Sequence, residues 1–186
     1  SGTVYDIYRH DYGEYLTSST TTRKTSTSGA STLFDSTFYV LTTARNVYKC
    51  LDNDGNTAST VEPTGTSTAV QTLSDGYKWK YMYTLTASQQ ANFLSTDFMA
   101  VATDSTVSSA AVAGAIDIIK IKTAGSGGTN GTHTNIDIRG DGTGGKCSVT
   151  VSGGAVTAVT VTTAGTGYTF ATVSNAQIVA AGATSL

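Results

Sequence analysis

Large aromatic side chains alternate with other residues in the stretch 75–83, DGYKWKYMY. The aromatic positions are Tyr77, Trp79, Tyr81 and Tyr83. Since successive side chains of a β-strand point to opposite faces, this period of two predicts a strand over 77–85 with its aromatic rings on one side. Similar apolar patterns predict strands over 38–43 and 47–51, and Asn53-Asp54-Gly55 predicts a tight turn after them.

A short helix and an extended segment follow the aromatic strand. Thr86 is followed three residues later by Gln89, a capping-box pattern that predicts a helix over 86–92. Residues 97–103 return to an extended pattern. By contrast, residues 17–32, TSSTTTRKTSTSGAST, are rich in hydroxyl groups and poor in apolar residues, so we expect a loop or arm that does not fold by itself.

The second half of the chain contains an internal repeat. GAIDIIKIKTAGSGGT at 114–129 aligns without a gap on GAVTAVTVTTAGTGYT at 154–169, a shift of 40 residues. The same shift matches further pairs, namely Asn135 with Asn175, Ile138 with Ile178, and Gly142 with Gly182. Each copy predicts a strand, a TAGxG turn, a looser segment and a further strand. Such units bury their apolar faces against one another, so we expect a compact β-sandwich or a short β-solenoid-like module.

These patterns predict an all-β fold with two parts. Residues 1–104 are expected to form a β-sandwich-like unit with one short helix, and residues 114–186 a β-repeat module of two copies with a period of 40. Residues 105–113 would link the two parts. The composition agrees, because abundant threonine and serine, 20 glycines and one proline disfavour long helices and favour strands and turns.

Charged residues make up 13% of the chain, and the formal net charge is -2. This balance gives no electrostatic reason to expect nucleic acid or an anionic membrane surface as a partner. No apolar run approaches the roughly 20 residues of a membrane-spanning helix. Two cysteines, Cys50 and Cys147, make neither a metal cluster nor a disulfide framework, so we expect no metal site.

Two loops resemble ligand-binding motifs. In 140–147, GDGTGGKC, the glycines have the spacing of a nucleotide loop, but Cys147 stands where a phosphate-binding loop needs Ser or Thr, and a strand pattern follows in place of a helix. A glycine-rich hairpin loop is therefore favoured. The stretch 52–56, DNDGN, begins like a calcium loop, yet Pro63 occupies the twelfth position, where a bidentate acid is required. A hairpin turn explains it better.

The chain offers few groups for catalysis. His10 and His133 are the 2 histidines, and neither stands beside a nucleophile in the sequence. A triad assembled in space from distant residues stays open. We expect that the protein is not an enzyme and has no cofactor and no small-molecule substrate.

The aromatic strand could serve a core, an assembly surface or a ligand platform. A fully buried ring is worth about 2–3 kcal/mol, and Trp79 and Tyr81 are the predicted core residues. Tyrosine keeps a hydroxyl that needs a partner, which suits a rim sealed by polar neighbours or by another subunit. The candidate interface residues are Tyr77, Tyr83, Tyr39 and Tyr48.

Several blocks of the first hundred residues resemble a known family and follow its order. They are SGTVYDIYRHDY at 1–12, FYVLTTARNVYKCLDNDGN at 38–56, ASTVEPTGTS at 58–67, SDGYKWKYMYTL at 74–85 and FLSTDFMAV at 93–101. The combination of NVYKCL, STVEPTG and DGYKWKYMYT is the specific part. In these blocks the chain resembles the baseplate wedge subunit of T4-like contractile-tail bacteriophages, particularly the version carried by marine cyanophages.

The resemblance implies a non-enzymatic structural virion protein, built from β-sandwich domains, that dimerises and bridges neighbouring proteins in each wedge of the tail baseplate. Its partners would be other baseplate proteins, and it would be assembled in the host cytoplasm. Family members begin upstream of the SGTVYD block, so this chain, whose first residue is Ser, is expected to lack an N-terminal part. The repeat at 114–186 departs from the family's shared core and would be a peripheral β module.

The alternative from another class is a receptor- or carbohydrate-binding module of a phage tail or fibre. Sugar sites usually present exposed aromatic rings beside acids and amides. Residues 104–186 contain only two aromatics, Tyr168 and Phe170, which argues against a sugar site in the repeat.

The arm at 17–32 provides a first test. Deleting it should leave folding intact but weaken assembly, because we expect the arm to become ordered only on a neighbouring subunit. Incorporation of the deletion variant into particles, compared with that of the intact chain, measures the effect. Incorporation at an unchanged level would refute the assignment of the arm to assembly.

Overall fold

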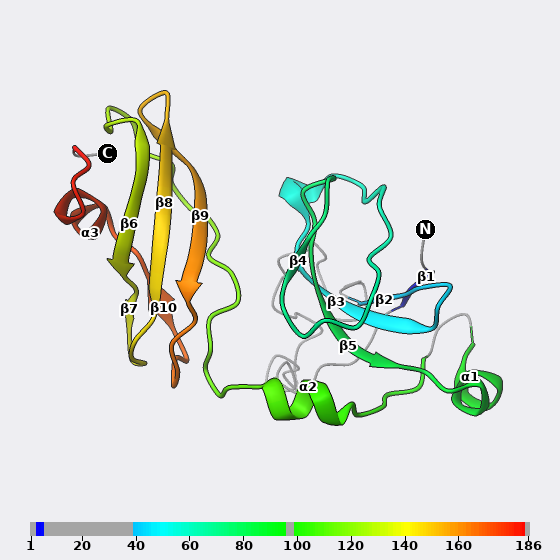
Figure 1. The fold of residues 1–186 in the computed structure, drawn as a ribbon. Coiled ribbons are helices and arrows are strands. Elements are labelled where there is room, and N and C mark those ends of the chain that lie inside the picture. Colours follow the sequence, from blue (N-terminus) through cyan, green and yellow to red (C-terminus); the bar gives the residue numbers. More distant parts are fainter. Residues whose placement is uncertain (1–2, 6–38, 96–98, 185–186) are drawn as a thin grey trace, which may run out of the picture. The chain divides into compact units, whose positions relative to one another are not determined.

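The computed structural model describes residues 3–5, 39–95 and 99–184 and divides the chain into two compact units (Figure 1). Unit 1 comprises Ser1–Ala110, and unit 2 comprises Ala111–Leu186. Both consist mainly of antiparallel strands with a few short helices, so the fold is predominantly β. Within the part of the chain that is described, no helix has the length and apolar character that crossing a membrane requires.

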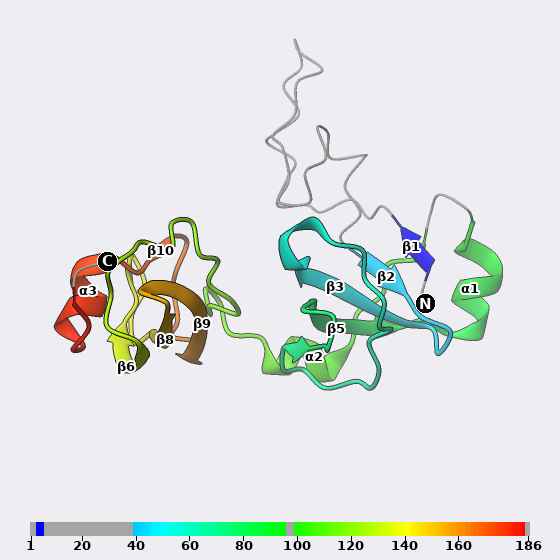
Figure 2. The same ribbon diagram turned by 90° about the horizontal axis from the view of Figure 1, so that it is seen from above.

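Unit 1 contains one five-stranded antiparallel sheet with the order β1-β2-β3-β5-β4 (Figures 1 and 2). The strands are β1 (Thr3–Tyr5), β2 (Tyr39–Leu41), β3 (Asn46–Asp52), β4 (Gln71–Thr72) and β5 (Lys78–Thr84). The patterns at 38–43, 47–51 and 77–85 therefore predicted the three inner strands. The arm expected at 17–32 lies outside the described residues.

The sheet of unit 1 buries side chains on both faces, because consecutive strand residues point in opposite directions. The first-face cluster contains Tyr39, Leu41, Val47, Tyr83, Leu85 and Met99. The second-face cluster contains Val40, Tyr48, Trp79 and Tyr81. Cross-strand pairing agrees with this division, since Val47 is opposite Tyr83 and Tyr48 is opposite Tyr81.

A β-bulge separates Tyr81 from Tyr83 and corrects the expectation that the aromatic rings share one side. Tyr48 pairs with Tyr81 and Val47 pairs with Tyr83, so Met82 is the extra residue of β5 in the pairing with β3. One extra residue reverses the alternation of a strand. Tyr81 and Tyr83 therefore face opposite sides of the sheet, although a single residue separates them.

Helix α1 (Ala87–Phe93) begins at the predicted capping box. The Thr86 hydroxyl accepts a hydrogen bond from Gln89 N at 3.1 Å, and Gln89 Oε1 accepts one from Thr86 N at 2.9 Å. These bonds satisfy backbone donors that the first turn of a helix leaves without intrahelical partners. A 3₁₀ helix, η2 (Asp54–Asn56), occupies the predicted tight turn.

Helix α2 (Ser105–Ala110) occupies most of 105–113, where a linker was expected. Asp104 Oδ1 accepts hydrogen bonds from Thr106 N at 2.8 Å and Val107 N at 3.0 Å, which starts the helix. Val107 packs against the second-face cluster. The segment before the helix, residues 99–103, forms no strand, and residues 97 and 98 lie outside the described residues.

Unit 2 contains a three-stranded antiparallel sheet with the order β6-β8-β9, and a two-stranded sheet of β10 and β7 (Figure 1). The elements are β6 (Gly131–Asp137), β7 (Arg139–Gly140), β8 (Lys146–Ser152), β9 (Ala155–Thr163), β10 (Ala171–Thr172) and helix α3 (Asn175–Ala180). One apolar core includes Ile136, Ile138, Cys147, Val149, Val151, Val156, Tyr168, Ile178 and Ala183.

The two copies of the repeat differ in secondary structure, so the prediction of equal strand patterns is wrong. The second copy forms β9, but residues 115–122 of the first copy belong to no sheet in the described part of the chain. The first copy then forms β6, whereas the matching stretch 171–177 forms β10 and the start of α3. The same pattern of apolar residues therefore folds differently according to its neighbours.

The bulge predicts opposite outcomes for two single-residue deletions in β5. Removing Met82 leaves a regular strand that keeps Tyr81 on the second face and Tyr83 on the first, so unit 1 should fold with a small loss of stability. Removing Lys80 makes Trp79 and Tyr81 adjacent and turns one large ring out of its cluster, at a cost of about 3–5 kcal/mol. Urea unfolding followed by the fluorescence of Trp79, the 1 tryptophan, measures both variants. Equal midpoints would contradict the assigned register.

Candidate functional site

The aromatic strand contributes to the core of unit 1. Trp79 and Tyr81 have exposed fractions of 6% and 3% and belong to the second-face cluster. Tyr77 is half-buried and stacks on Trp79, with 5.4 Å between ring centroids and an interplanar angle of 18°. The Nε1 of Trp79 is buried and has no hydrogen-bond partner within the described residues.

Three of the four candidate interface residues are buried inside their own unit, which leaves little of their side chains exposed to a partner. They are Tyr39, Tyr48 and Tyr83. The first two belong to the inner strands β2 and β3, which have neighbours on both sides in the sheet. Tyr83 is turned into the first-face cluster by the bulge. Tyr77 keeps partial exposure.

Tyrosine hydroxyls find their partners within unit 1, which removes the reason for placing them at a rim. Tyr83 donates to Ala100 O at 3.1 Å. Tyr81 donates to Asp104 Oδ2 at 3.2 Å and also contacts Thr84 Oγ1 at 2.8 Å. Tyr48 donates to Gly65 O and accepts from Asn46 Nδ2 at 3.3 Å.

Hydrogen bonds fix the loop 57–65 to β3 and to the residues just before β5. The Tyr48 hydroxyl donates to Gly65 O, and the Tyr77 hydroxyl donates to Thr57 O at 2.5 Å. Asp75 Oδ2 accepts bonds from three loop donors, Ser59 Oγ at 2.8 Å, Thr60 N at 2.9 Å and Val61 N at 3.0 Å. Together these bonds form the loop network.

The electrostatics of the loop network suit a structural role. Desolvation acts to raise the pKa of Asp75, but hydrogen bonds from Ser59, Thr60 and Val61 outweigh it and hold the pKa below its ordinary value. Burial raises the pKa of Tyr48 above its ordinary value. Near neutral pH the carboxylate is ionised and the phenol is neutral, so neither group is poised to exchange a proton. The network can hold a loop but is not tuned for acid–base chemistry.

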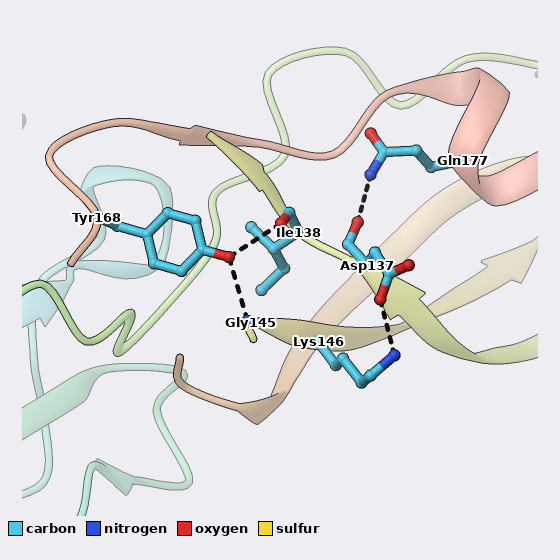
Figure 3. A network of polar contacts seen from close by, with 6 residues as sticks. All are labelled: Asp137, Ile138, Gly145, Lys146, Tyr168 and Gln177. Carbon is cyan, nitrogen blue, oxygen red and sulfur yellow. Dashed lines mark hydrogen bonds and ion pairs between the residues drawn. The ribbon is translucent and has the colours of Figure 1, made fainter. Parts of the chain in front are cut away.

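In unit 2, Tyr168 holds the glycine-rich loop at 140–147. Its hydroxyl donates to Ile138 O at 3.0 Å and accepts from Gly145 N at 3.1 Å (Figure 3). A Cβ added at Gly142 would lie 2.4 Å from Tyr168 Cγ, and one added at Gly145 would lie 2.9 Å from the Tyr168 hydroxyl. The glycines therefore make room for the ring. The loop leads into strand β8, so it lacks the helix that phosphate binding requires.

Further polar contacts near Tyr168 join helix α3 to β6, β6 to β8, and the glycine-rich loop to residues 169 and 170. Gln177 of α3 donates to Asp137 O, and Lys146 Nζ lies 2.7 Å from Asp137 Oδ1 (Figure 3). Asp141 accepts bonds from Thr169 N at 2.9 Å and Phe170 N at 3.2 Å. Bonds from Thr169 and Phe170 lower the pKa of Asp141 to about 2.

A cavity of about 600 Å³ lies within unit 2. Residues 116 and 118–125 line it, and so does the stretch 171–178 through Ala171, Thr172, Val173, Asn175 and Ile178. Ile138, Val149 of β8, and Val156 and Val159 of β9 complete the apolar lining. This volume falls in the range of ligand-binding pockets. Sequence reasoning missed the cavity, because the apolar pattern of 116–122 predicted a paired strand.

The remaining candidates are metal binding, the calcium-like stretch 52–56 and the two histidines. No group of three or more histidine, cysteine or acidic side chains there could hold a metal ion. Asp52 of the calcium-like stretch lies 3.8 Å from Lys78 Nζ. His133 Nε2 contacts Thr129 O at 3.1 Å, and His10 lies outside the described residues.

Sequence reasoning also missed Asp75 and Tyr168, which fix the loops of the two units. Asp75 stands directly before Gly76, and no local pattern distinguishes it from an ordinary turn residue. A signal for Tyr168 was present, since the TAGTGYT copy has a tyrosine where TAGSGGT has Gly128. Comparisons of the chain with family models, with curated proteins and with solved structures found no match.

The buried tyrosines predict a loss of stability at alkaline pH. Burial raises the pKa of Tyr83 to about 12, whereas an unfolded tyrosine ionises near pH 10. Because the folded state holds the proton more tightly, the stabilisation is complete below pH 10 and is lost as the pH rises from about 10 to about 12. The free energy of unfolding should fall by on the order of 1–3 kcal/mol across this window.

Urea unfolding between pH 9 and pH 12, followed by Trp79 fluorescence, measures this loss. Tyr83→Phe removes the titrating group and should give a smaller fall than the unsubstituted chain. Tyr77→Phe is the comparison variant: burial also raises the pKa of Tyr77, but this ring is only half-buried, so Tyr77→Phe should reduce the fall less than Tyr83→Phe does. An equal fall in the Tyr83→Phe variant would contradict the assignment.

Proposed function

We propose that the chain is a structural virion protein of a phage tail baseplate and that it acts through contacts between subunits of the baseplate wedge. The loop network supports this proposal. Four of its bonds join the three sequence blocks that carry the resemblance to the wedge subunit: NVYKCL supplies Tyr48, STVEPTG supplies residues 59–65 of the loop, and DGYKWKYMYT supplies Asp75.

The three blocks depend on one another through these bonds. The Tyr48 hydroxyl needs the Gly65 carbonyl, and the Asp75 carboxylate needs the donors at 59–61. A chain that kept NVYKCL and lost STVEPTG would leave the hydroxyl of the buried Tyr48 without this acceptor, which costs about 1–3 kcal/mol. We therefore expect the three blocks to occur together in proteins that share this fold, as the resemblance to the wedge subunit implies.

Two exposed apolar side chains of unit 1 are candidates for contacts with neighbours. Phe93 is 63% exposed and Val101 is 73% exposed. They stand at the two ends of the block FLSTDFMAV, which is part of the resemblance. Apolar and aromatic side chains are enriched at the centres of protein interfaces.

The finer features of the expected fold belong to the same proposal. Residues 1–104 would form a β-sandwich, as in the wedge family. The chain would dimerise, and the repeat at 114–186 would be a peripheral β module. A carbohydrate-binding role for the repeat is not favoured, because Tyr168 is buried in the core of unit 2. That leaves Phe170 as the exposed aromatic side chain of the described part of unit 2.

A substitution pair on helix α1 tests the proposal. Phe93→Ser should lower incorporation into tail particles by roughly tenfold or more, because burying a phenylalanine at a contact is worth about 2–3 kcal/mol. Ala91→Ser changes an exposed position of the same helix and should have no effect. Incorporation is measured by quantitative mass spectrometry of purified particles.

A density map of the intact particle provides the second measurement. The fold of unit 1 should fit density in the baseplate wedge, with Phe93 at a boundary between chains. Absence of the chain from purified particles, or density for it outside the tail, would overturn the proposal.

A further inference from the structure

The two copies of the repeat exchange equivalent backbone hydrogen bonds. Ile116 N donates to Ala164 O at 2.9 Å. The shift of 40 matches Ile116 with Val156 and Ala124 with Ala164, and Val156 N donates to Ala124 O, also at 2.9 Å. Similarly, Tyr168 N donates to Gly114 O at 3.1 Å, and Gly128 N donates to Gly154 O at 2.8 Å. Exchanging the copies maps each bond onto its equivalent, which is the pattern of a two-fold interface.

The two-fold relation matches each strand of the β6-β8-β9 sheet with a position in the other half of unit 2. β9 at one edge corresponds to residues 115–123, and β6 at the other edge corresponds to residues 171–177. β8 lies between β6 and β9. Its equivalent position lies between 115–123 and 171–177, and the cavity is lined by residues of both stretches. The cavity therefore occupies the position that β8 has in the other half.

We propose that this cavity accepts a β-strand of a partner polypeptide in the position equivalent to β8. The partner strand is extended and carries apolar side chains at alternate positions, as β8 does. In β8, Cys147, Val149 and Val151 are buried, and the residues between them are half-buried. The inference stands on the repeat itself and does not depend on the assignment to a baseplate.

Residues 116–122, IDIIKIK, have the properties of a strand that receives a partner. Their apolar residues are a strand pattern, and Ile116 and Ile119 already pack against the core of unit 2. The equivalent strand β9 pairs with β8 along its length. Main-chain bonds give such strand addition its affinity, and pockets for alternate side chains give it specificity. Lys120 and Lys122 are residues of the type that natural edge strands use against unspecific pairing.

Ile121 and Val179 provide a matched pair of substitutions for the test. Both are 39% exposed, so neither is needed to fill the core. Ile121 lines the cavity, whereas Val179, on helix α3, does not. Ile121→Asp places a charge where the partner strand would pack, and Val179→Asp introduces the same charge elsewhere in unit 2.

The experiment titrates the full chain into a fluorescein-labelled peptide with the β8 sequence KCSVTVS, under reducing conditions, and follows anisotropy. The control peptide has both valines replaced by aspartate. We expect saturable binding of the first peptide only, weakened roughly tenfold or more by Ile121→Asp and unchanged by Val179→Asp. Hydrogen exchange should show new amide protection within 117–123 when the peptide is bound.

Three outcomes would overturn the inference. They are failure of the β8 peptide to bind at about 1 mM, equal binding of the aspartate peptide, and binding that Ile121→Asp leaves unchanged. Thermal melting of both variants without peptide shows whether they remain folded, so that a loss of binding in a folded Ile121→Asp variant counts in favour of the proposal.

Discussion

A backbone N–H or C=O group that leaves water must find a hydrogen-bond partner, and this requirement organises both units. Strand pairing meets it inside the sheets. In the loops, side chains provide such partners: the carboxylates of Asp75 and Asp141 accept bonds from backbone N–H groups, and tyrosine hydroxyls bond to backbone groups as well. Tyr48 and Tyr77 hold the carbonyls of Gly65 and Thr57 in unit 1, and Tyr168 holds both a carbonyl and an amide in unit 2. A tyrosine is suited to this task because its ring can be buried while its hydroxyl bonds to a loop.

The sequence predicted the elements whose signals are local. Alternation identified β3 and β5, and the spacing of Thr86 and Gln89 identified α1. The face of Tyr83 could not be predicted, because the extra residue Met82 is defined only by the pairing of two strands. The role of Tyr168 depends on Gly145, which lies 23 residues away in the sequence. Helix α2 had a signal in Asp104, a favourable N-cap residue before Ser105.

The two copies fold differently because the residues at the start of each copy differ. Gly153 and Gly154 have φ values of 63° and 80°, and this left-handed geometry makes the tight turn that places β8 beside β9. The matching positions of the first copy are Ala113 and Gly114. Alanine disfavours a positive φ, so the chain before 114 is not turned back as a hairpin partner. Residues 115–122 then keep the strand pattern without the neighbour that would make them a strand.

The free-energy cost of an empty cavity limits what can occupy the cavity of unit 2. At about 24 cal/mol per Å³, an empty closed void of about 600 Å³ would cost on the order of 14 kcal/mol, as much as the whole stability of a typical domain. A void of this kind cannot persist, so the space must be reached by water or filled by another chain. If water fills the cavity, four apolar lining side chains face solvent, namely Ile116, Ile118, Ile119 and Ile121. A strand with apolar residues at alternate positions would cover these side chains instead. The same hydrogen bonds that join the two copies thus create a surface on which a further strand is the complementary partner.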